Sequence, residues 1–372
     1  MHKNSVVDKF QYLKSIFPGV VLALIFCLFS QGINNVLAIE IFGTEKSPIS
    51  TVLIAILLGI LMGNAFTPRP GMMIGLDFTQ QYILKLGIIF LGIRLSFADF
   101  IKFGSVAIPL VIFCILGVLI LIKLLIKKVP ISSKMSYLIA IGTSVCGATA
   151  IVATAPVINA KKTEVAYAIA NITLFGVIAM LVYPYFAEWY FDDNALEAGL
   201  FLGTSIHETS QVAAAGLIYD QQFSNPETLD VATVTKLIRN TFLVILIPLF
   251  AYLYNRGEVK DQKYSIFGIF PYFVLGFIGM IILRNLGDQF FSLENNNIYI
   301  WSKFIEYLKV LTTVFLTMAM AAVGISINLS ELKSMGYKPF IVGLIAATTV
   351  AVSYTHLRAH ETRGNLVCRL LL

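Results

Sequence analysis

The sequence predicts an all-α polytopic membrane protein with about eleven transmembrane segments, two of them broken or re-entrant. Hydrophobic residues make up 58% of the 372 residues and charged residues 13%, and the mean hydropathy is +0.82. A soluble domain is nearer half apolar and a quarter charged. In addition, one glycine- and hydroxyl-rich phrase occurs twice at membrane depth. Such a pair is typical of irregular backbone that lines a transport site.

Apolar stretches of about twenty residues define the segments along the chain. They fall at residues 18–38, 48–66, 80–97, 105–127, 136–158, 163–186, 198–217, 231–254, 266–284, 305–327 and 338–352. No long polar stretch separates them, so we predict a single transmembrane domain over 17–352. Residues 1–16 contain lysines but no short apolar core with a cleavage site, which indicates a cytoplasmic lead-in rather than a signal peptide.

The charged residues and cysteines exclude several classes of protein. The net charge of +6 lies in loops, which indicates orientation in the membrane rather than nucleic-acid binding. Cys27, Cys114, Cys146 and Cys368 show no paired spacing, so neither a disulfide framework nor a metal site is predicted. No motif indicates a cofactor.

The last twenty residues differ from the rest of the chain. The apolar pattern stops after Val352, and 353–372 resemble translated adapter read-through at the end of a gene sequence. We therefore predict that this tail is not native and that the final segment is truncated.

The positive-inside rule with a cytoplasmic N-terminus fits every loop except those beside two segments. If 136–158 and 198–217 cross the membrane, Lys161 and Lys162 lie outside and the acidic residues of 188–197 lie inside. If both segments re-enter on the side that they left, the same charges fall on the expected sides. The two disputed segments are those that carry the repeated phrase.

That phrase begins Gly-Thr-Ser in both copies. The copy at 142–153 reads Gly-Thr-Ser-Val-Cys-Gly-Ala-Thr-Ala-Ile-Val-Ala, and the copy at 203–214 reads Gly-Thr-Ser-Ile-His-Glu-Thr-Ser-Gln-Val-Ala-Ala. Close helix packing is the alternative explanation, since small residues let membrane helices approach. Packing does not require His207, Glu208 and Gln211 within one helical turn, so a site is favoured.

A second internal similarity relates 91–99 to 323–331, with Gly104 matching Gly336. These two stretches are predicted to cross in opposite directions, which is the mark of inverted repeats. The two similarities are nested, and no single duplication explains both.

Four stretches together resemble the YeiH-type sulfate exporter family. They are Gly-Thr-Ser-x-Cys-Gly-x-x-Ala-Ile at 142–151, Ala-Pro-Val-Ile at 155–158, Glu-Val-Ala-Tyr-Ala-Ile-Ala at 164–170 and the phrase at 203–212. The resemblance runs from about Phe17 to Val352, although Glu208 stands where the family phrase has Asp. It implies an inner-membrane secondary transporter related to the cation:proton antiporter and anion transporter superfamily. Inverted repeats of five helices are implied, with broken helices that cross near the midplane. The resemblance therefore favours segments that cross the membrane over re-entrant ones, against the loop charges.

The residues of the two phrases could bind an anion. Free N–H groups at half-helix N-termini attract anions, and we expect the Gly-Thr-Ser residues to lie there. The predicted substrate-binding residues are Gly142, Thr143, Ser144, Cys146, Gly203, Thr204, Ser205, Gln211 and Arg239. Thr143 and Thr204 could instead cap helices in a dry bundle. Lys236 and Arg94 could extend to the interface, which leaves Arg239 as the strongest intramembrane charge.

His207 and Glu208 are the predicted proton-coupling pair, because a neighbouring carboxylate tunes a histidine that titrates near neutrality. A histidine hydrogen-bonded within the bundle is the alternative. The expected partners are a small inorganic or sulfonate anion, the lipid bilayer and protons or sodium as coupling ion, with a homodimer left open.

The sequence therefore predicts a secondary transporter, not an enzyme, that exports a small anion such as sulfate by alternating access. An anion channel or a membrane sensor is the first alternative. The second is an intramembrane hydrolase that uses Ser144 or Cys146 with His207, although no group is in place to orient the histidine.

Overall fold

The computed structural model describes residues 4–43, 47, 49–66, 69–125, 132–254, 270–291, 298–328, 330 and 340–352. Every regular element within these ranges is helical, which confirms the predicted all-α class. Seven of these helices are long and apolar enough to cross a membrane: Tyr12–Ile41, Pro70–Arg94, Phe97–Leu121, Lys162–Phe191, Pro226–Phe250, Phe273–Phe291 and Ile298–Ser326. The predicted tail at 353–372 lies outside the described residues.

The remaining predicted segments also have helical counterparts. Thr51–Ala65 and Phe340–Val352 are shorter apolar helices, and the two segments with the repeated phrase are broken helices. All eleven predicted segments are therefore represented. How many of them cross the bilayer, and whether they form inverted repeats, remain predictions.

The chain divides into two compact units. Unit 1 contains the described residues of 1–99, 217–226 and 272–331, and unit 2 contains those of 100–216, 227–271 and 332–372. The prediction of a single transmembrane domain over 17–352, with a lead-in at 1–16, is not tested by this division.

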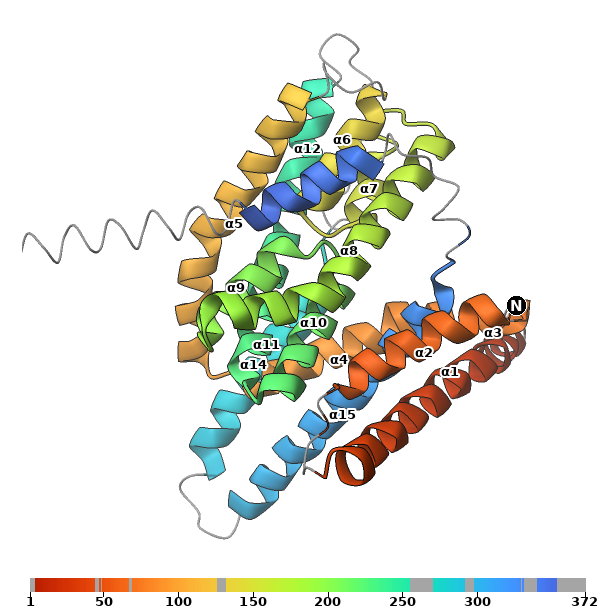
Figure 1. Ribbon diagram of the computed structural model, residues 1–372, viewed down its shortest axis with the longest axis vertical. Coiled ribbons are helices and arrows are strands. Elements are labelled where there is room, and N and C mark those ends of the chain that lie inside the picture. Colours follow the sequence, from red (N-terminus) through yellow and green to blue (C-terminus); the bar gives the residue numbers. More distant parts are fainter. Residues whose placement is uncertain are drawn as a thin grey trace, which may run out of the picture. The chain divides into compact units, whose positions relative to one another are not determined.

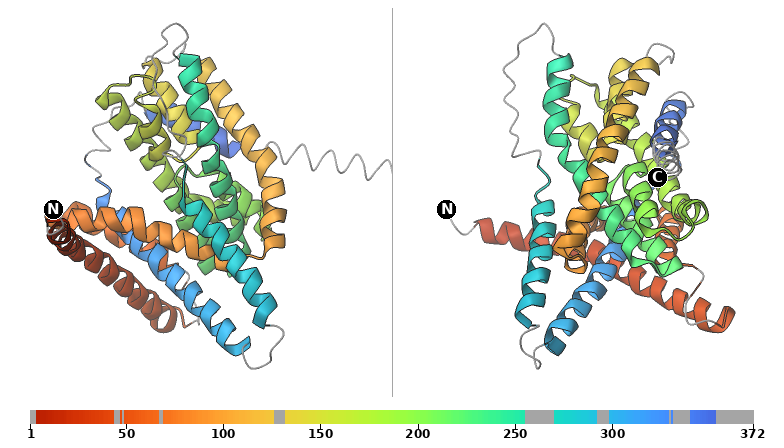
Figure 2. Two further views of the ribbon diagram at one scale, coloured as in Figure 1. Left: turned by 180° about the vertical axis from the view of Figure 1, so that it is seen from behind. Right: turned by 90° about the vertical axis from the view of Figure 1, so that its left-hand side faces the viewer.

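Unit 1 consists mainly of long helices (Figures 1 and 2), and several of these helices pack through glycines. A side-chain carbon at Gly19 or Gly75 would lie about 2 Å from the backbone of the facing helix, and Gly59 and Gly324 form a similar contact. Close packing of this kind replaces the hydrophobic effect between helices in lipid. The elements are α1 (Asn4–Val36), η1 (Leu37–Ile41), α2 (Thr51–Ala65), α3 (Pro70–Phe78), η2 (Thr79–Ile83), α4 (Leu84–Leu91), η3 (Gly92–Arg94), α14 (Phe273–Phe291) and α15 (Ile298–Ser326).

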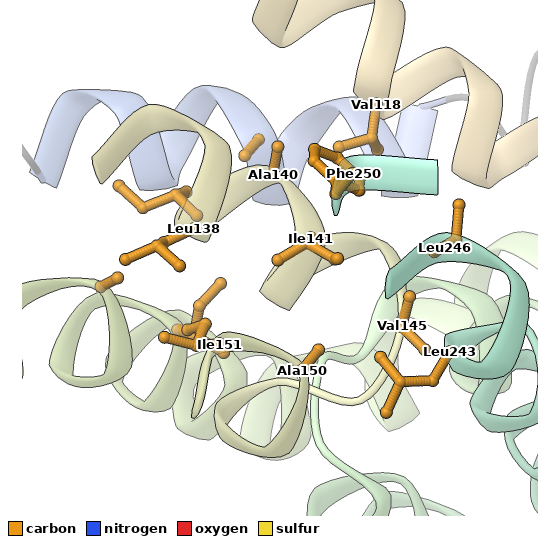
Figure 3. Close-up of a cluster of buried hydrophobic side chains, with 14 of the residues drawn as sticks. Val118, Leu138, Ala140, Ile141, Val145, Ala150, Ile151, Leu243, Leu246 and Phe250 are labelled. Atoms are coloured by element: carbon orange, nitrogen blue, oxygen red, sulfur yellow. The ribbon is translucent and has the colours of Figure 1, made fainter. Parts of the chain in front are cut away.

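Unit 2 contains both copies of the repeated phrase. Its elements are most of α5 (Phe97–Leu125), α6 (Ser133–Ser144), α7 (Ala148–Thr154), α8 (Lys162–Phe191), α9 (Ala195–Ser205), the first half of α10 (Thr209–Phe223), most of α11 (Pro226–Thr241), α12 (Leu243–Tyr254) and the helix Phe340–Val352. Figure 3 shows an apolar core in which α6 and α7 pack against α5 and α12. This core holds the first broken segment in place.

The first broken segment turns back on itself. Lys134 Nζ, in the first turn of α6, donates to the Asn159 carbonyl oxygen at 2.7 Å. Ser132, just before α6, donates to the Glu164 carboxylate in the first turn of α8. Since α6 alone is about 18 Å long at 1.5 Å per residue, a crossing segment would separate these residues by the width of the bilayer. The segment is therefore a hairpin whose two ends lie together.

The second broken segment is also a hairpin. At its start, the Thr228 hydroxyl of α11 donates to the Ala195 carbonyl at 3.4 Å. On α9, Gly199 faces Val231, and on the returning α10, Gly216 faces Leu229. Both arms of the hairpin thus lie against the same turns of α11, and its open end lies near the beginning of that helix.

The hairpin form of these two segments does not fit the crossing topology that the family resemblance implies, and the side on which each hairpin enters the membrane remains a prediction. The open ends of the two hairpins lie at opposite ends of α8 (Figure 1). The first hairpin leads into the N-terminus of α8, and the second hairpin follows its C-terminus. This is the arrangement that the loop charges indicated: Lys161 and Lys162 stay on the same side as Lys134. The orientation of the N-terminus itself remains a prediction.

Candidate functional site

The site lies where the tips of the two hairpins meet. Each Gly-Thr-Ser phrase forms the last turn of a half-helix: α6 ends at Ser144 and α9 ends at Ser205. Our expectation that these residues form half-helix N-termini is wrong. The breaks follow them, at 145–147 and 206–208, and α7 and α10 begin beyond the breaks. The residues of the phrase therefore present carbonyl groups at the tips, and these carbonyls attract cations.

Arg239 on α11 binds the ends of both half-helices. Its Nε donates to the Ser144 carbonyl at 2.7 Å, and Nη1 donates to the carbonyls of Thr204 and Ile206 at 2.5 and 3.1 Å. Nη2 donates to the Thr143 carbonyl. The side chain is 1% exposed. One guanidinium thus joins the two hairpins by satisfying carbonyls that have no partner within their own helices.

Lys236, one turn before Arg239, binds the two breaks. Its Nζ donates to the Val145 carbonyl at 2.7 Å and to the Ile206 carbonyl at 3.0 Å. A third bond reaches the His207 carbonyl. The side chain is fully buried. All three ammonium protons therefore have acceptors, and Lys236 does not extend to the membrane interface.

The depth of this cluster follows from the position of α11. That helix begins at Pro226, and Lys236 is ten residues further along. At 1.5 Å per residue this distance is about 15 Å, half of the roughly 30 Å thickness of a bilayer core. This length predicts that the hairpin tips meet well inside the membrane, toward its midplane.

Glu208 is the acidic residue at the tips. Its Oε1 accepts from the Ala148 backbone N–H, the first residue of α7, at 3.4 Å. Gly147 makes this contact possible, because it has a φ of +66° and a Cβ there would lie 2.4 Å from Glu208 Cγ. A carboxylate at a helix N-terminus is favourable for the helix dipole.

Gln211 ties the second hairpin to α8. Its Oε1 accepts from the Glu208 N–H at 3.3 Å, and its Nε2 donates to the Thr173 carbonyl at 3.4 Å. Gly176 on α8 provides the space, since a Cβ there would lie 1.9 Å from Gln211 Oε1. The amide therefore fixes the backbone immediately beside the break.

Several buried polar atoms at the tips have no hydrogen-bond partner among the described residues. They are Thr143 Oγ1, Ser144 Oγ, Ser205 Oγ, both ring nitrogens of His207, Thr235 Oγ1 and Asn240 Oδ1. Buried polar atoms usually have partners, so a group of this kind indicates a place where water, a proton or a ligand is accommodated. Because neither nitrogen of His207 has a partner, the structure contains no Ser144–His207 or Cys146–His207 dyad.

The structure thus brings the predicted site residues together, although not all in the expected way. Gly142 and Gly203 are packing positions, since a Cβ there would meet Ile151 at 2.8 Å and the Ala232 carbonyl at 2.7 Å. Thr204 donates to its own helix, to the Leu200 carbonyl, and Cys146 is half-buried in the first break. Whether any of these residues binds substrate remains a prediction.

Comparison with known proteins gives the family. The model of the family described as "Conserved hypothetical protein 698" matches residues 18–343. A UPF0324 membrane protein of Streptococcus agalactiae, SAG1125, is 34% identical over 333 residues, covering 89% of this chain and 93% of the relative. The UPF0324 inner membrane protein YeiH of Escherichia coli K12 is 31% identical over 307 residues, covering 80% of this chain and 81% of the relative. The chain belongs to this family.

Membership in the UPF0324 family confirms the resemblance found in the sequence. A further relative, FN0533 of Fusobacterium nucleatum, is 34% identical over 82% of this chain. The relatives' names describe membrane or inner membrane proteins, in agreement with the apolar helices of this chain. No solved structure gives a significant match.

The sequence reasoning missed Lys236 as a member of the site. It placed Lys236 near the start of its segment because the hydropathy of 226–230 is low, whereas the helix begins at Pro226. Proline is favoured at the first helical position, and this signal could have corrected the boundary. The role of Gly176 could not have been found in the sequence, because only the packed structure shows its contact with Gln211.

Arg94, the alternative intramembrane cation, has a different role. It lies in unit 1, where its Nη2 is 3.3 Å from the Asp220 carboxylate, and it also donates to the Pro226 carbonyl. Its side chain is 12% exposed. Arg94 therefore fixes the end of α10 within unit 1.

Proposed function

We propose that this protein is a secondary transporter that moves a small anion, sulfate or a related sulfur oxyanion, by alternating access. The observation that carries the proposal is the balance of charge at the hairpin tips. Two buried cations, Lys236 and Arg239, are opposed by one carboxylate, Glu208. The half-helix ends contribute partial charges of roughly half a unit, two negative and two positive, which cancel.

About one positive charge is therefore left uncompensated near the midplane. A charge at that depth is costly, and intramembrane charges are functional candidates for this reason. Binding of an anion would compensate it. The unpartnered hydroxyls of Ser144 and Ser205 supply neutral donors beside the same carbonyl ends that Arg239 holds.

Alternating access requires two parts of the protein that can move relative to each other around a fixed substrate site. The division of the chain into two compact units supports this mechanism, since the whole tip cluster belongs to unit 2. We propose further that the chain is not an enzyme, that its N-terminus is cytoplasmic, and that protons rather than sodium are the coupling ion. A carrier is favoured over a channel because Lys236, Arg239 and His207 at the tips are buried.

Flux into proteoliposomes tests the proposal. Purified protein is reconstituted and assayed with radiolabelled sulfate in competition with sulfite, taurine and sulfoacetate. We expect flux that saturates with one of these anions and falls at least about tenfold in Ser205→Ala, since about 1.4 kcal/mol corresponds to tenfold. Ser105→Ala, at an exposed hydroxyl on α5, is the matched control and should transport like the wild type. Flux that rises linearly with concentration would indicate a channel, and no flux with any of these anions would contradict the proposal.

A further inference from the structure

The two titratable residues of the second break, His207 and Glu208, have opposite surroundings. The His207 side chain is 1% exposed, and neither ring nitrogen has a partner among the described residues. The backbone carbonyl of the same residue is bound by Lys236. A proton on this imidazole would create a third buried cation beside Lys236 and Arg239, without an acceptor for its N–H groups. Such an uncompensated buried charge is strongly disfavoured.

Glu208 has the properties that His207 lacks. Glu208 is less buried than His207, so it is the more accessible of the two residues to a proton from water. Its Oε1 accepts from the Ala148 N–H, and a carboxylic acid retains a carbonyl oxygen that can accept the same bond. Protonation therefore removes a charge without breaking the contact between the hairpins. The titratable or charged groups that surround it are Cys146 in the first break, His207 in the second, and Lys236 and Arg239 on α11, with Cys114 of α5 next to Arg239.

We propose that Glu208, not His207, carries the coupled proton, and that its protonation strengthens binding of the anion. The step is the transfer of one proton from water to the Glu208 carboxylate, with no other bond made or broken. It removes the one negative side chain of the tip cluster, so the uncompensated charge rises from about one to about two. This inference rests on the proposed anion transport at the same site.

The sign of this coupling determines the kind of transport. Two ligands that each strengthen the binding of the other do so by the same factor, because linkage is reciprocal. The proton and the anion therefore occupy the site together and cross together, which makes the protein a proton–anion symporter. Export coupled to proton entry would require the two to exclude each other. An inward proton gradient should thus drive the anion inward.

Infrared spectroscopy and anion binding test the two parts separately. Difference spectra of the wild type between about pH 5.5 and pH 8, the range in which a coupling group titrates, should show a protonated carboxyl band at low pH. The band should be missing in Glu208→Gln and present in His207→Gln. Glu306→Gln, at an exposed carboxylate of α15, is the matched control and should keep the band. A band that persists in Glu208→Gln, or that is lost in His207→Gln alone, overturns the assignment of the proton.

Sulfate binding by calorimetry in detergent is measured on the same variants. We expect wild-type affinity to rise about 5- to 150-fold at the lower pH, the usual range of coupling between two ligands. Glu208→Gln should bind tightly at both pH values. An affinity that is unchanged or lower at low pH overturns symport. If the carboxyl band behaves as expected but neither sulfate nor the other anions bind, the proposed anion transport fails and symport with it, while the proton site at Glu208 stands.

Discussion

Replacing Lys236 by methionine tests whether the buried ammonium holds the hairpin tips together. Methionine preserves the length of the side chain but has no N–H donors. Three carbonyls lose their bond, yet Ile206 keeps a second donor in Arg239 Nη1. Two carbonyls, those of Val145 and His207, are therefore left without this donor. At about 1–3 kcal/mol for each buried unsatisfied acceptor, the expected loss is about 2–6 kcal/mol.

A loss of this size is a large part of the 5–15 kcal/mol that typically stabilises a protein. The assay is thermal unfolding of the purified protein in detergent, followed by size-exclusion chromatography of heated samples. The control is Lys102→Met. Lys102 is 62% exposed, and its ion pair with the Glu227 carboxylate, at 3.9 Å, is worth about 0–1 kcal/mol. The reasoning is refuted if Lys236→Met and Lys102→Met unfold at the same temperature.

Three further predictions concern packing, the guanidinium and the tail. Gly176→Ala should displace Gln211 and lower both transport and thermal stability. The control is Gly279→Ala, where a Cβ meets nothing within 4 Å, and this variant should be neutral or stabilised by up to about 1 kcal/mol. Equal effects of the two substitutions on the melting temperature would contradict the contact between Gly176 and Gln211. Arg239→Lys keeps the charge but loses the planar guanidinium, so it should lower the melting temperature while anion binding persists. Arg239→Gln should lose both thermal stability and anion binding. Normal anion binding by Arg239→Gln would show that the charge is structural only. Removal of 353–372 should leave transport unchanged, and a truncated protein that no longer elutes as a single species would show that the tail is part of the fold.

Much of the fold could be predicted from the sequence, because the class follows from hydropathy and the breaks follow from glycine-rich phrases at membrane depth. The loop charges around Lys162 and Asp193 indicated re-entrant segments, which agrees with the hairpins of the structure, whereas the family resemblance indicated crossing helices. The direction of the half-helices could not be predicted, since a Gly-Thr-Ser phrase can end a helix as well as begin one. The hydrogen-bond partners of Lys236 are backbone carbonyls. Because every residue has a carbonyl, no side-chain pattern in the sequence predicts which ones bind Lys236.

Apart from Lys236, the site was predictable in its members but not in its chemistry. From the sequence, an anion-binding or proton-binding role could be assigned to each side chain by its type alone. In the structure the guanidinium of Arg239 donates to four carbonyls, and His207 lies near two buried cations while Glu208 is only partly buried. These differences arise from long-range packing of α11 against both hairpins, which sequence spacing does not contain.

The claim on which the whole account depends is that the two hairpins enter from opposite faces of the membrane. Single cysteines introduced as Lys162→Cys and Asp193→Cys into a cysteine-free background, each treated with a membrane-impermeant maleimide in right-side-out and inverted vesicles, test it directly. We predict that position 162 reacts from the cytoplasmic face and position 193 from the outside. The reverse pattern would show that both segments cross, and labelling of both positions from one face would contradict either topology.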